Sequence, residues 1–407
     1  MKVTPTKLIR DAFHDCNPTG NYRNENAGWP YQARFPEGKD AWIACEGNGS
    51  KLTLSGNRMN QIHNRNRQSI NGLIYVNNAD FDCSITEFYA CAANCSKGLC
   101  ITFEGSGTHS ITGSRFNYCG MKWTSDGSVI YIGGNSQNNF NDVKFDTTGN
   151  GNSNPQKWEI APTRALRICN QSNLLYNQMH CYNHTSDTGG GFLKMETTGY
   201  VNITGGNIHF CCDRLSDPKA AVYKVSTGFL KLESLNINGC GFQEGQTGAT
   251  TLWMENSNIE IINCEIRFDS RFAAKACVGL KVIRKGYIRI NSNKFIACQR
   301  GVIYLGQEGG EEDAEIKDNH FNQLTQAVEG CAIEAYLWNE STVFTGNRFN
   351  ELPPNVPAVK IVFQGTLSKD NYTVSNQEFT GFRTSGNGNA FLISTVENKP
   401  VVFNNCF

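Results

Sequence analysis

Nine short segments of the chain place a large aromatic or charged residue between flanking residues that are mostly apolar. Of these nine middle residues, four are cations, four are aromatic and one is an acid. They are Tyr131, Arg167, Lys194, Tyr223, Trp253, Lys281, Tyr304, Glu334 and Lys360. Aromatic rings stack on the apolar faces of sugars, whereas Arg and Lys bind carboxylates and sulfates. If the segments stack in register, the set predicts a groove for an acidic polysaccharide.

Arg167, Lys194 and Tyr223 have the residue types that β-elimination requires. A lyase needs a cation to neutralise the uronate carboxylate and a base, such as Lys or Tyr, to remove the neighbouring proton. The three residues fall on successive segments of the set. We therefore take them as the candidate catalytic residues of a lyase.

Glu196 and Glu255 offer a competing chemistry, because paired carboxylates hydrolyse glycosidic bonds. Each lies two residues beyond a member of the set. Stacked strands are ~4.8 Å apart, so carboxylates two strands apart would be separated by about 10 Å. That distance is near the upper end expected for an inverting glycosidase.

The remaining aromatic and cationic residues are candidates for substrate binding. They are Tyr131, Trp253, Lys281 and Tyr304, together with Trp158 in an Asn- and Gly-rich insertion over residues 146–162. Loops grafted on a rigid scaffold often carry binding function. The same surface has a second interpretation as the subunit contact of a trimer, where Tyr, Trp and Arg are also enriched, and a third as a solvated face without a role.

A repeat along the chain must position these residues. Its apolar anchors recur at intervals of 26 to 34 residues, most of them 28 or 29. The anchors are Met59, Phe88, Phe116, Phe145, Met179, Ile208, Ile237, Ile266, Phe295, Phe321, Phe349, Phe379 and Phe407. The segments are short and alternate with period two, which indicates a solenoid of β-strands and not of helices.

Two further columns accompany the anchors. Asn recurs two residues before many of them, as at Asn293, Asn319 and Asn347, where we expect a left-handed corner. Cys recurs three residues after, as at Cys91 and Cys119, and Leu or Phe takes the same place in later repeats. We therefore expect these thiols to be packed inside the solenoid, where free Cys behaves as a small hydrophobe.

Composition and charge exclude several classes of protein. The chain has 407 residues, with 37 Lys and Arg against 37 Asp and Glu. This balance indicates neither a nucleic-acid partner nor an anionic membrane surface. No apolar run approaches the ~20 residues that span a bilayer, so no membrane insertion is expected. With 17 Cys and no evident signal peptide, we expect mostly reduced thiols.

The coil length, the corner Asn residues and the stacked interior aliphatics resemble the right-handed, single-stranded parallel β-helix of the pectate-lyase type. The resemblance covers residues 51–407, and residues 1–50 are predicted to cap the first coil. Within that architecture the chain looks most like a bacteriophage tailspike or capsule depolymerase. This resemblance implies a homotrimer in the virion tail, assembled in the host cytoplasm, that acts outside the cell on a capsular or O-antigen polysaccharide.

The resemblance also bears on cofactors. Lyases of this fold use Arg and Lys on adjacent coils, often with Ca²⁺, but no Asp ligand motif of the calcium-dependent members can be matched here. We therefore expect neither a metal nor another cofactor. His180 and His209, each one residue after an anchor, are expected to form an exposed stacked pair. A non-catalytic receptor-binding fibre is the remaining alternative.

Overall fold

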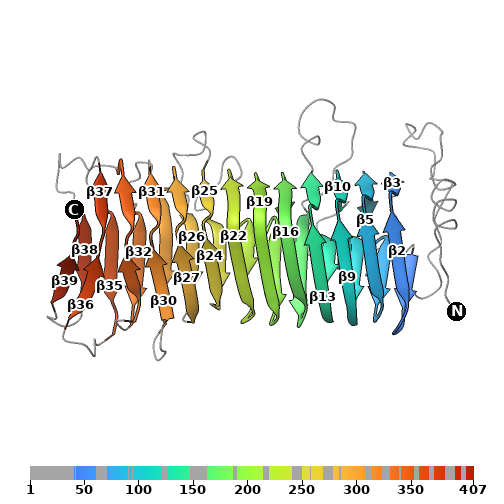
Figure 1. Ribbon diagram of the computed structural model, residues 1–407, viewed down its shortest axis with the longest axis horizontal. Helices are drawn as coiled ribbons and strands as arrows, with labels where there is room; N and C mark the ends of the chain where they lie inside the picture. Colours follow the sequence, from blue (N-terminus) through green and yellow to red (C-terminus); the bar gives the residue numbers. More distant parts are fainter. Residues whose placement is uncertain are drawn as a thin grey trace.

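The computed structural model shows a single stack of parallel β-coils (Figure 1). It describes residues 41, 43–60, 71–89, 91–93, 95–121, 127–146, 163–186, 190–213, 220–240, 250–256, 258–268, 278–283, 286–307, 313–322, 331–338, 341–352, 357–365, 371–380, 390–395 and 400–407. These residues form strands, turns and bends without a helix, so none offers a helical membrane span. The predicted all-β parallel solenoid is confirmed.

One face of the solenoid is a 13-stranded parallel sheet. Its strands, one from each coil, are β1 (Ile43–Glu46), β4 (Ile74–Asn77), β8 (Gly98–Glu104), β12 (Ser128–Ile132), β15 (Arg164–Asn170), β18 (Leu193–Thr197), β21 (Val222–Lys224), β23 (Thr250–Glu255), β26 (Val278–Ile283), β29 (Arg300–Leu305), β32 (Ile333–Leu337), β35 (Val359–Phe363) and β38 (Phe391–Ser394). Alternate residues point inward and outward, so this sheet displays the predicted set of residues.

The rest of each coil belongs to a 22-stranded sheet that bends at a corner. Its strands are β2 (Lys51–Ser55), β3 (Arg58–Asn60), β5 (Asp80–Ser84), β6 (Glu87–Tyr89), β9 (Ser106–Thr112), β10 (Arg115–Asn117), β13 (Asn135–Asn141), β14 (Lys144–Asp146), β16 (Asn173–Tyr182), β19 (Tyr200–His209), β22 (Phe229–Asn238), β24 (Ile259–Ile262), β25 (Glu265–Arg267), β27 (Tyr287–Asn291), β28 (Lys294–Ile296), β30 (Asp313–Lys317), β31 (His320–Asn322), β33 (Val343–Thr345), β34 (Arg348–Asn350), β36 (Tyr372–Ser375), β37 (Glu378–Thr380) and β39 (Val401–Asn404). Two short pairs complete the topology: β7 (Ala92–Ala93) with β11 (Gly120–Met121), and β17 (Thr185–Ser186) with β20 (Cys212–Asp213).

The interior is filled by stacks of equivalent side chains. Phe295, Phe321, Phe349 and Phe379 stack nearly parallel, with ring centroids 5.0 to 5.3 Å apart. The predicted Cys column is also confirmed as interior packing, because its described members are fully buried. These members are Cys91, Cys119, Cys211, Cys240 and Cys298. Burial of these columns along the whole stack holds successive coils in register.

Two of the predicted anchors are wrong. Phe145 pairs with Cys181 and not with Met179, so the anchor of this coil comes two residues later than predicted. Met179 and Cys181 are both buried, so an apolar pattern alone does not show which of them is the anchor. Phe407 is 81% exposed, whereas a true anchor is buried. The shift at Cys181 also separates the predicted histidine pair: His180 lies beside Asn207, and His209 lies beside Tyr182.

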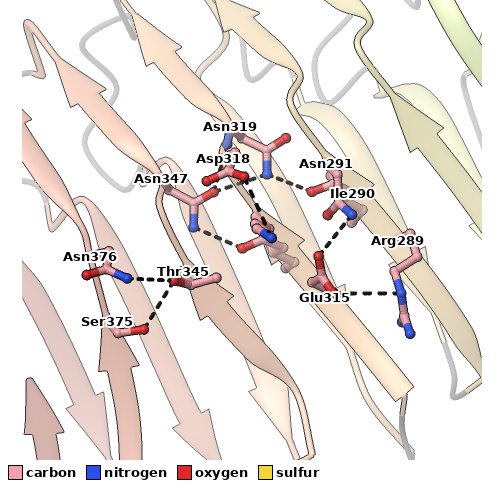
Figure 2. Close-up of polar contacts among 12 residues, drawn as sticks. Arg289, Ile290, Asn291, Glu315, Asp318, Asn319, Thr345, Asn347, Ser375 and Asn376 are labelled. Carbon is pink, nitrogen blue, oxygen red and sulfur yellow. Dashed lines mark hydrogen bonds and ion pairs between the residues drawn. The ribbon is translucent and has the colours of Figure 1, made fainter. Parts of the chain in front are cut away.

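The corner asparagines have a different role from the one predicted. At Asn293 and Asn319 the residue with positive φ is the one before the Asn, Ser292 (59°) and Asp318 (54°). The Asn side chains instead point inward and form a ladder of hydrogen bonds from coil to coil (Figure 2). Asn319 Oδ1 accepts bonds from the backbone N and Nδ2 of Asn293, both at 3.0 Å.

Candidate functional site

The outward column of the 13-stranded sheet is the candidate site. Eight of the nine predicted residues lie in one register, and only the member from β29 differs. The observed column is Tyr131, Arg167, Lys194, Tyr223, Trp253, Lys281, Ile303, Glu334 and Lys360. Trp158 lies outside the described residues, as do the predicted insertion loop and most of the predicted N-terminal cap.

The prediction that Tyr304 faces outward is wrong. Tyr304 is fully buried and pairs with Val282 and Ala335, whereas Ile303 takes the outward place beside Lys281. The register is set by Gly301, where a Cβ would lie 2.4 Å from a ring carbon of Phe321. Only glycine fits at this position. The outward place therefore falls on Ile303, one residue earlier than the apolar pattern predicts.

The centre of the column is a carboxylate held by two cations. Glu196 accepts a hydrogen bond from Arg167 Nε at 2.6 Å and an ion pair from Lys194 Nζ at 3.1 Å. The three side chains are 13 to 24% exposed, so the cluster is largely shielded but reachable. It brings together three predicted catalytic residues and has a formal charge of +1.

Glu196 is held in its ionised form. Burial alone would raise the pKa of Glu196, but the hydrogen bond and charge of Arg167 and the charge of Lys194 outweigh it and lower the pKa. The Cys169 thiol donates to Glu196 Oε2 at 3.3 Å. Burial and the negative charge of Glu196 raise the pKa of Cys169 to about 11, so this thiol is not a thiolate nucleophile.

Tyr131 closes one side of this cluster. Arg167 lies 5.9 Å from the centre of the Tyr131 ring, and Lys97 lies 5.7 Å from it. Lys97 also forms an ion pair with Glu104, which accepts a hydrogen bond from the Tyr75 hydroxyl at 3.4 Å. Sequence reasoning missed Lys97, Glu104 and Tyr75, although Tyr75 continues the column two strands beyond Tyr131.

Trp253 and Lys281 form the other side. Lys281 Nζ lies 3.9 Å from the centre of the Trp253 ring, within the range of a cation–π contact. The indole Nε1 of Trp253 donates to Glu255 at 3.2 Å. Tyr223 lies between Lys194 and Trp253 in the column and is partly exposed.

A second charged cluster lies beyond Ile303. Glu334 accepts bonds from Lys360 Nζ at 2.9 Å and from the Tyr336 hydroxyl at 2.8 Å. Arg300 lies 3.3 Å away on its other oxygen. Burial would raise the pKa of Glu334, but the bonds from Lys360 and Tyr336 and the charge of Arg300 lower it. The side chain of Glu334 is only 7% exposed, which makes this cluster more enclosed than the one at Glu196.

The described part of this face has no group of acidic residues arranged as metal ligands. In the described ranges, one set of His, Cys, Asp or Glu side chains lies close enough to share an ion, and it consists of interior thiols. Chemically, the face offers two fixed cations, a phenol and flanking aromatic rings. These are the groups for binding an anionic sugar and for moving a proton next to its carboxylate.

Comparison with known proteins identifies no family for this chain. No protein family profile matches the sequence, and no curated protein matches it. Similar solved structures include the periplasmic alginate epimerase AlgG, which is 10% identical over 80% of this chain and 77% of that chain, with a TM-score of 0.26. A variant of the same epimerase is 6% identical over 88% and 78% of the two chains, with a TM-score of 0.29. At these values the likeness assigns no activity to this chain.

Proposed function

We propose that this protein binds an acidic polysaccharide along the column from Tyr131 to Lys281 and cleaves it by β-elimination. The observation that carries the proposal is the cluster of Arg167, Lys194 and Glu196, in register with Tyr223. It concentrates positive charge at the middle of a face whose two sides are aromatic.

Each residue then has a role. Arg167 and Lys194 neutralise the uronate carboxylate, which makes the neighbouring carbon acid easier to deprotonate. Because Lys194 is ion-paired with Glu196, the proton passes to Tyr223, the next residue in the column, which acts as a phenolate. As the C–H electron pair forms the C=C bond, the bond to the leaving sugar oxygen breaks, and the Tyr223 hydroxyl returns the proton to that oxygen. Glu196 is a positioning residue that orients both cations. Trp253 stacks on a sugar beyond the bond that is cut, whereas Tyr131, which is only 8% exposed, supports Arg167 from the other side.

A glycoside hydrolase is the second candidate, and one observation favours it. Glu196 stays ionised, as a nucleophile or general base must. Glu255 would then be the acid, two strands away along the sheet. We rank this second because Glu196 is already occupied by Arg167, Lys194 and Cys169.

The biological setting remains part of the proposal. We infer a phage tailspike or capsule depolymerase, trimeric and acting on a bacterial capsular or O-antigen polysaccharide. The support is the resemblance of the repeat to such proteins together with a cationic and aromatic face. Electron microscopy of phage particles with antibodies against this chain would test its place in the tail.

The activity is tested by incubating the protein with a panel of uronate polysaccharides. A lyase creates a conjugated unsaturated uronate that absorbs in the ultraviolet, whereas a hydrolase creates reducing ends without it. Binding without either product would leave a receptor-binding fibre and refute both enzyme proposals.

The matched variants are Tyr223→Phe and Tyr200→Phe. Tyr223→Phe removes only the phenol oxygen and is expected to lower kcat at least 100-fold, because general base catalysis contributes about 10²- to 10⁴-fold. Tyr200 lies on the other sheet, stacked on Phe229, so its variant should keep full activity. Equal activity of the two variants would remove Tyr223 from the mechanism.

A further inference from the structure

Three cysteines gather at one point inside the solenoid, where one of them comes from a strand of the 13-stranded sheet. The Sγ atoms of Cys91, Cys100 and Cys119 all lie within 4.8 Å of one another, and all three residues are fully buried. In the described part of the chain no other group of three or more His, Cys, Asp or Glu side chains comes this close. Cys91 and Cys119 belong to the interior Cys column, but Cys100 does not.

Cys100 reaches this point because of a β-bulge in β8. Ser128 pairs with Gly98 and Ile130 pairs with Ile101, so β8 has one residue more than β12 over this step. The extra residue breaks the in–out alternation, and Leu99, Cys100 and Ile101 are all buried in succession. Bulges of this kind re-aim side chains and are common next to functional sites.

The bulge is stabilised by contacts of its own. Thr102 Oγ1 accepts a hydrogen bond from Gly98 N at 3.0 Å and lies 3.3 Å from Gly98 O. A Cβ on Gly98 would lie 1.9 Å from the Ile101 carbonyl oxygen, so only glycine fits. Thr102 itself is fully buried, although it stands in the outward column between Tyr75 and Tyr131. Both residues hold the third thiol in place.

From this geometry we propose that Cys91, Cys100 and Cys119 bind one thiophilic metal cation, Cu⁺. Three sulfur atoms placed ~2.3 Å from a central ion would be about 4.0 Å apart. The observed spread, up to 4.8 Å, needs only small side-chain movements to reach that arrangement. Soft thiolate ligands select Cu⁺ or Zn²⁺. Three ligands complete the coordination of Cu⁺, whereas Zn²⁺ in structural sites takes four.

The rest of the Cys column shows that stacked thiols alone do not make such a triangle. Cys211 Sγ lies 3.5 Å from Cys181 Sγ, and Cys211 N donates to Cys240 Sγ at 3.4 Å, but in the described residues these three sulfur atoms do not all lie within 4.8 Å of one another. The Cys298 thiol donates to the backbone carbonyls of Ile296 at 3.7 Å and Ile266 at 3.9 Å. These positions are therefore internal controls for packing without metal.

Binding should release protons. Burial raises the pKa values of Cys100 and Cys119, so both are thiols in the metal-free protein. The S–H groups of Cys91 and Cys119 donate to the carbonyl oxygens of Met59 (3.5 Å) and Phe88 (3.3 Å). Cu⁺ replaces protons on sulfur, and those protons leave to solvent; no electron transfer is involved.

The test uses the full chain, produced with copper in the medium and purified reduced and without oxygen. We expect one copper per chain, held against a Cu⁺ chelator, and X-ray absorption that shows three sulfur neighbours and Cu⁺. The Cys100→Ala variant should lose the copper, whereas Cys298→Ala should retain it. Circular dichroism checks that both variants fold.

If Cys100→Ala does not fold, the X-ray absorption spectrum of the unmodified protein still tests the three-sulfur copper site. Copper with nitrogen or oxygen neighbours, equal copper in both variants, or sub-stoichiometric copper lost to the chelator would each overturn the site. Zinc with four ligands under the same conditions would overturn the assignment of Cu⁺.

Discussion

Glu196 is the side chain on which the geometry of the candidate site depends. It binds Arg167 and Lys194, which come from adjacent coils, at one point. The fixed charges matter because a catalytic group displaced by about 1 Å can cost 100-fold in rate. The site is therefore sensitive to a residue that need not touch the reacting atoms.

We expect Glu196→Gln to lower kcat on a uronate polymer by about 10- to 100-fold, because the two cations lose their common anchor. Glu233→Gln is the matched control, since Glu233 pairs with Lys231 on the other sheet at 3.0 Å. Steady-state kinetics on both variants measures the effect. Unchanged kcat in Glu196→Gln would refute the positioning role.

His184 gives the molecule a pH-dependent stability. Its ring is buried, Nδ1 donates to the Thr163 carbonyl at 3.1 Å, and burial lowers its pKa to about 4. The unfolded chain takes up the proton near its ordinary pKa of 6.5, before the folded protein does. Stability is therefore complete above pH 6.5 and falls as the pH drops from there to 4, by at most about 1.4 kcal/mol per pH unit.

Urea unfolding between pH 7 and pH 5 checks this prediction. We expect the unfolding free energy of the unmodified protein to fall more steeply than that of His184→Gln, which keeps a donor but does not titrate. Parallel pH profiles of the two proteins would show that His184 is not responsible.

Among the elements, the corner between the two arms of the larger sheet is held by the Asn ladder. Asn319 donates from Nδ2 to the Ile290 carbonyl at 2.7 Å and to Asn347 Oδ1 at 3.1 Å (Figure 2). Each Asn is buried and serves the coil before and after it. Without these Asn side chains, the buried backbone groups at the corner would have few other hydrogen-bond partners.

We expect Asn319→Leu to lower the unfolding free energy by about 1 to 3 kcal/mol, because it leaves buried backbone groups without partners. Asn350→Leu is the control, as Asn350 is partly exposed and its bond to Asn322 is a long 3.5 Å. Denaturant titration of both variants makes the comparison. An equal loss in the two would mean that the ladder adds nothing specific.

The sequence was sufficient for the fold and for most of the column, and the error at Tyr304 has an identifiable cause. Repeat length and alternation determine which face a residue takes only where polar residues interrupt the apolar ones. In Val302-Ile303-Tyr304-Leu305 nothing interrupts them, and the register depends on Gly301 against the Phe321 ring. Such a contact between coils is invisible in one segment.

The site residues that were missed have other origins. Lys97 precedes the bulge of β8, and the bulge comes from Gly98 and Thr102 bonding to each other. The period-two alternation in the sequence does not reveal an inserted residue of this kind. Tyr75 was within reach of the pattern, because Ile74-Tyr75-Val76 repeats the apolar–x–apolar form of the later coils.

The molecule as a whole is a one-dimensional stack, in which each coil contacts mainly its neighbours. Damage to one coil should therefore remain local in its effect on native-state opening. The Phe column offers the test, because Phe321 is buried between two rings.

We expect Phe321→Ala to cost about 3 to 5 kcal/mol and to speed hydrogen exchange in β28, β31 and β34. Exchange in β5, β9 and β13, many coils away, should not change. Exchange measured by mass spectrometry resolves these strands. Faster exchange throughout the chain would indicate that the stack opens as a single unit.

The apolar residues on the outward side of β29 limit the length of polysaccharide that the proposed binding face can contact. Ile303 and Leu305 separate the stretch from Tyr131 to Lys281 from the charged cluster at Glu334. Five strand steps of ~4.8 Å make the first stretch about 24 Å long. Under the proposed function, this stretch holds only a limited number of sugars. Affinity for oligosaccharides should therefore grow with chain length and then level off. Replacing Ile303 with Lys should move that plateau to longer chains.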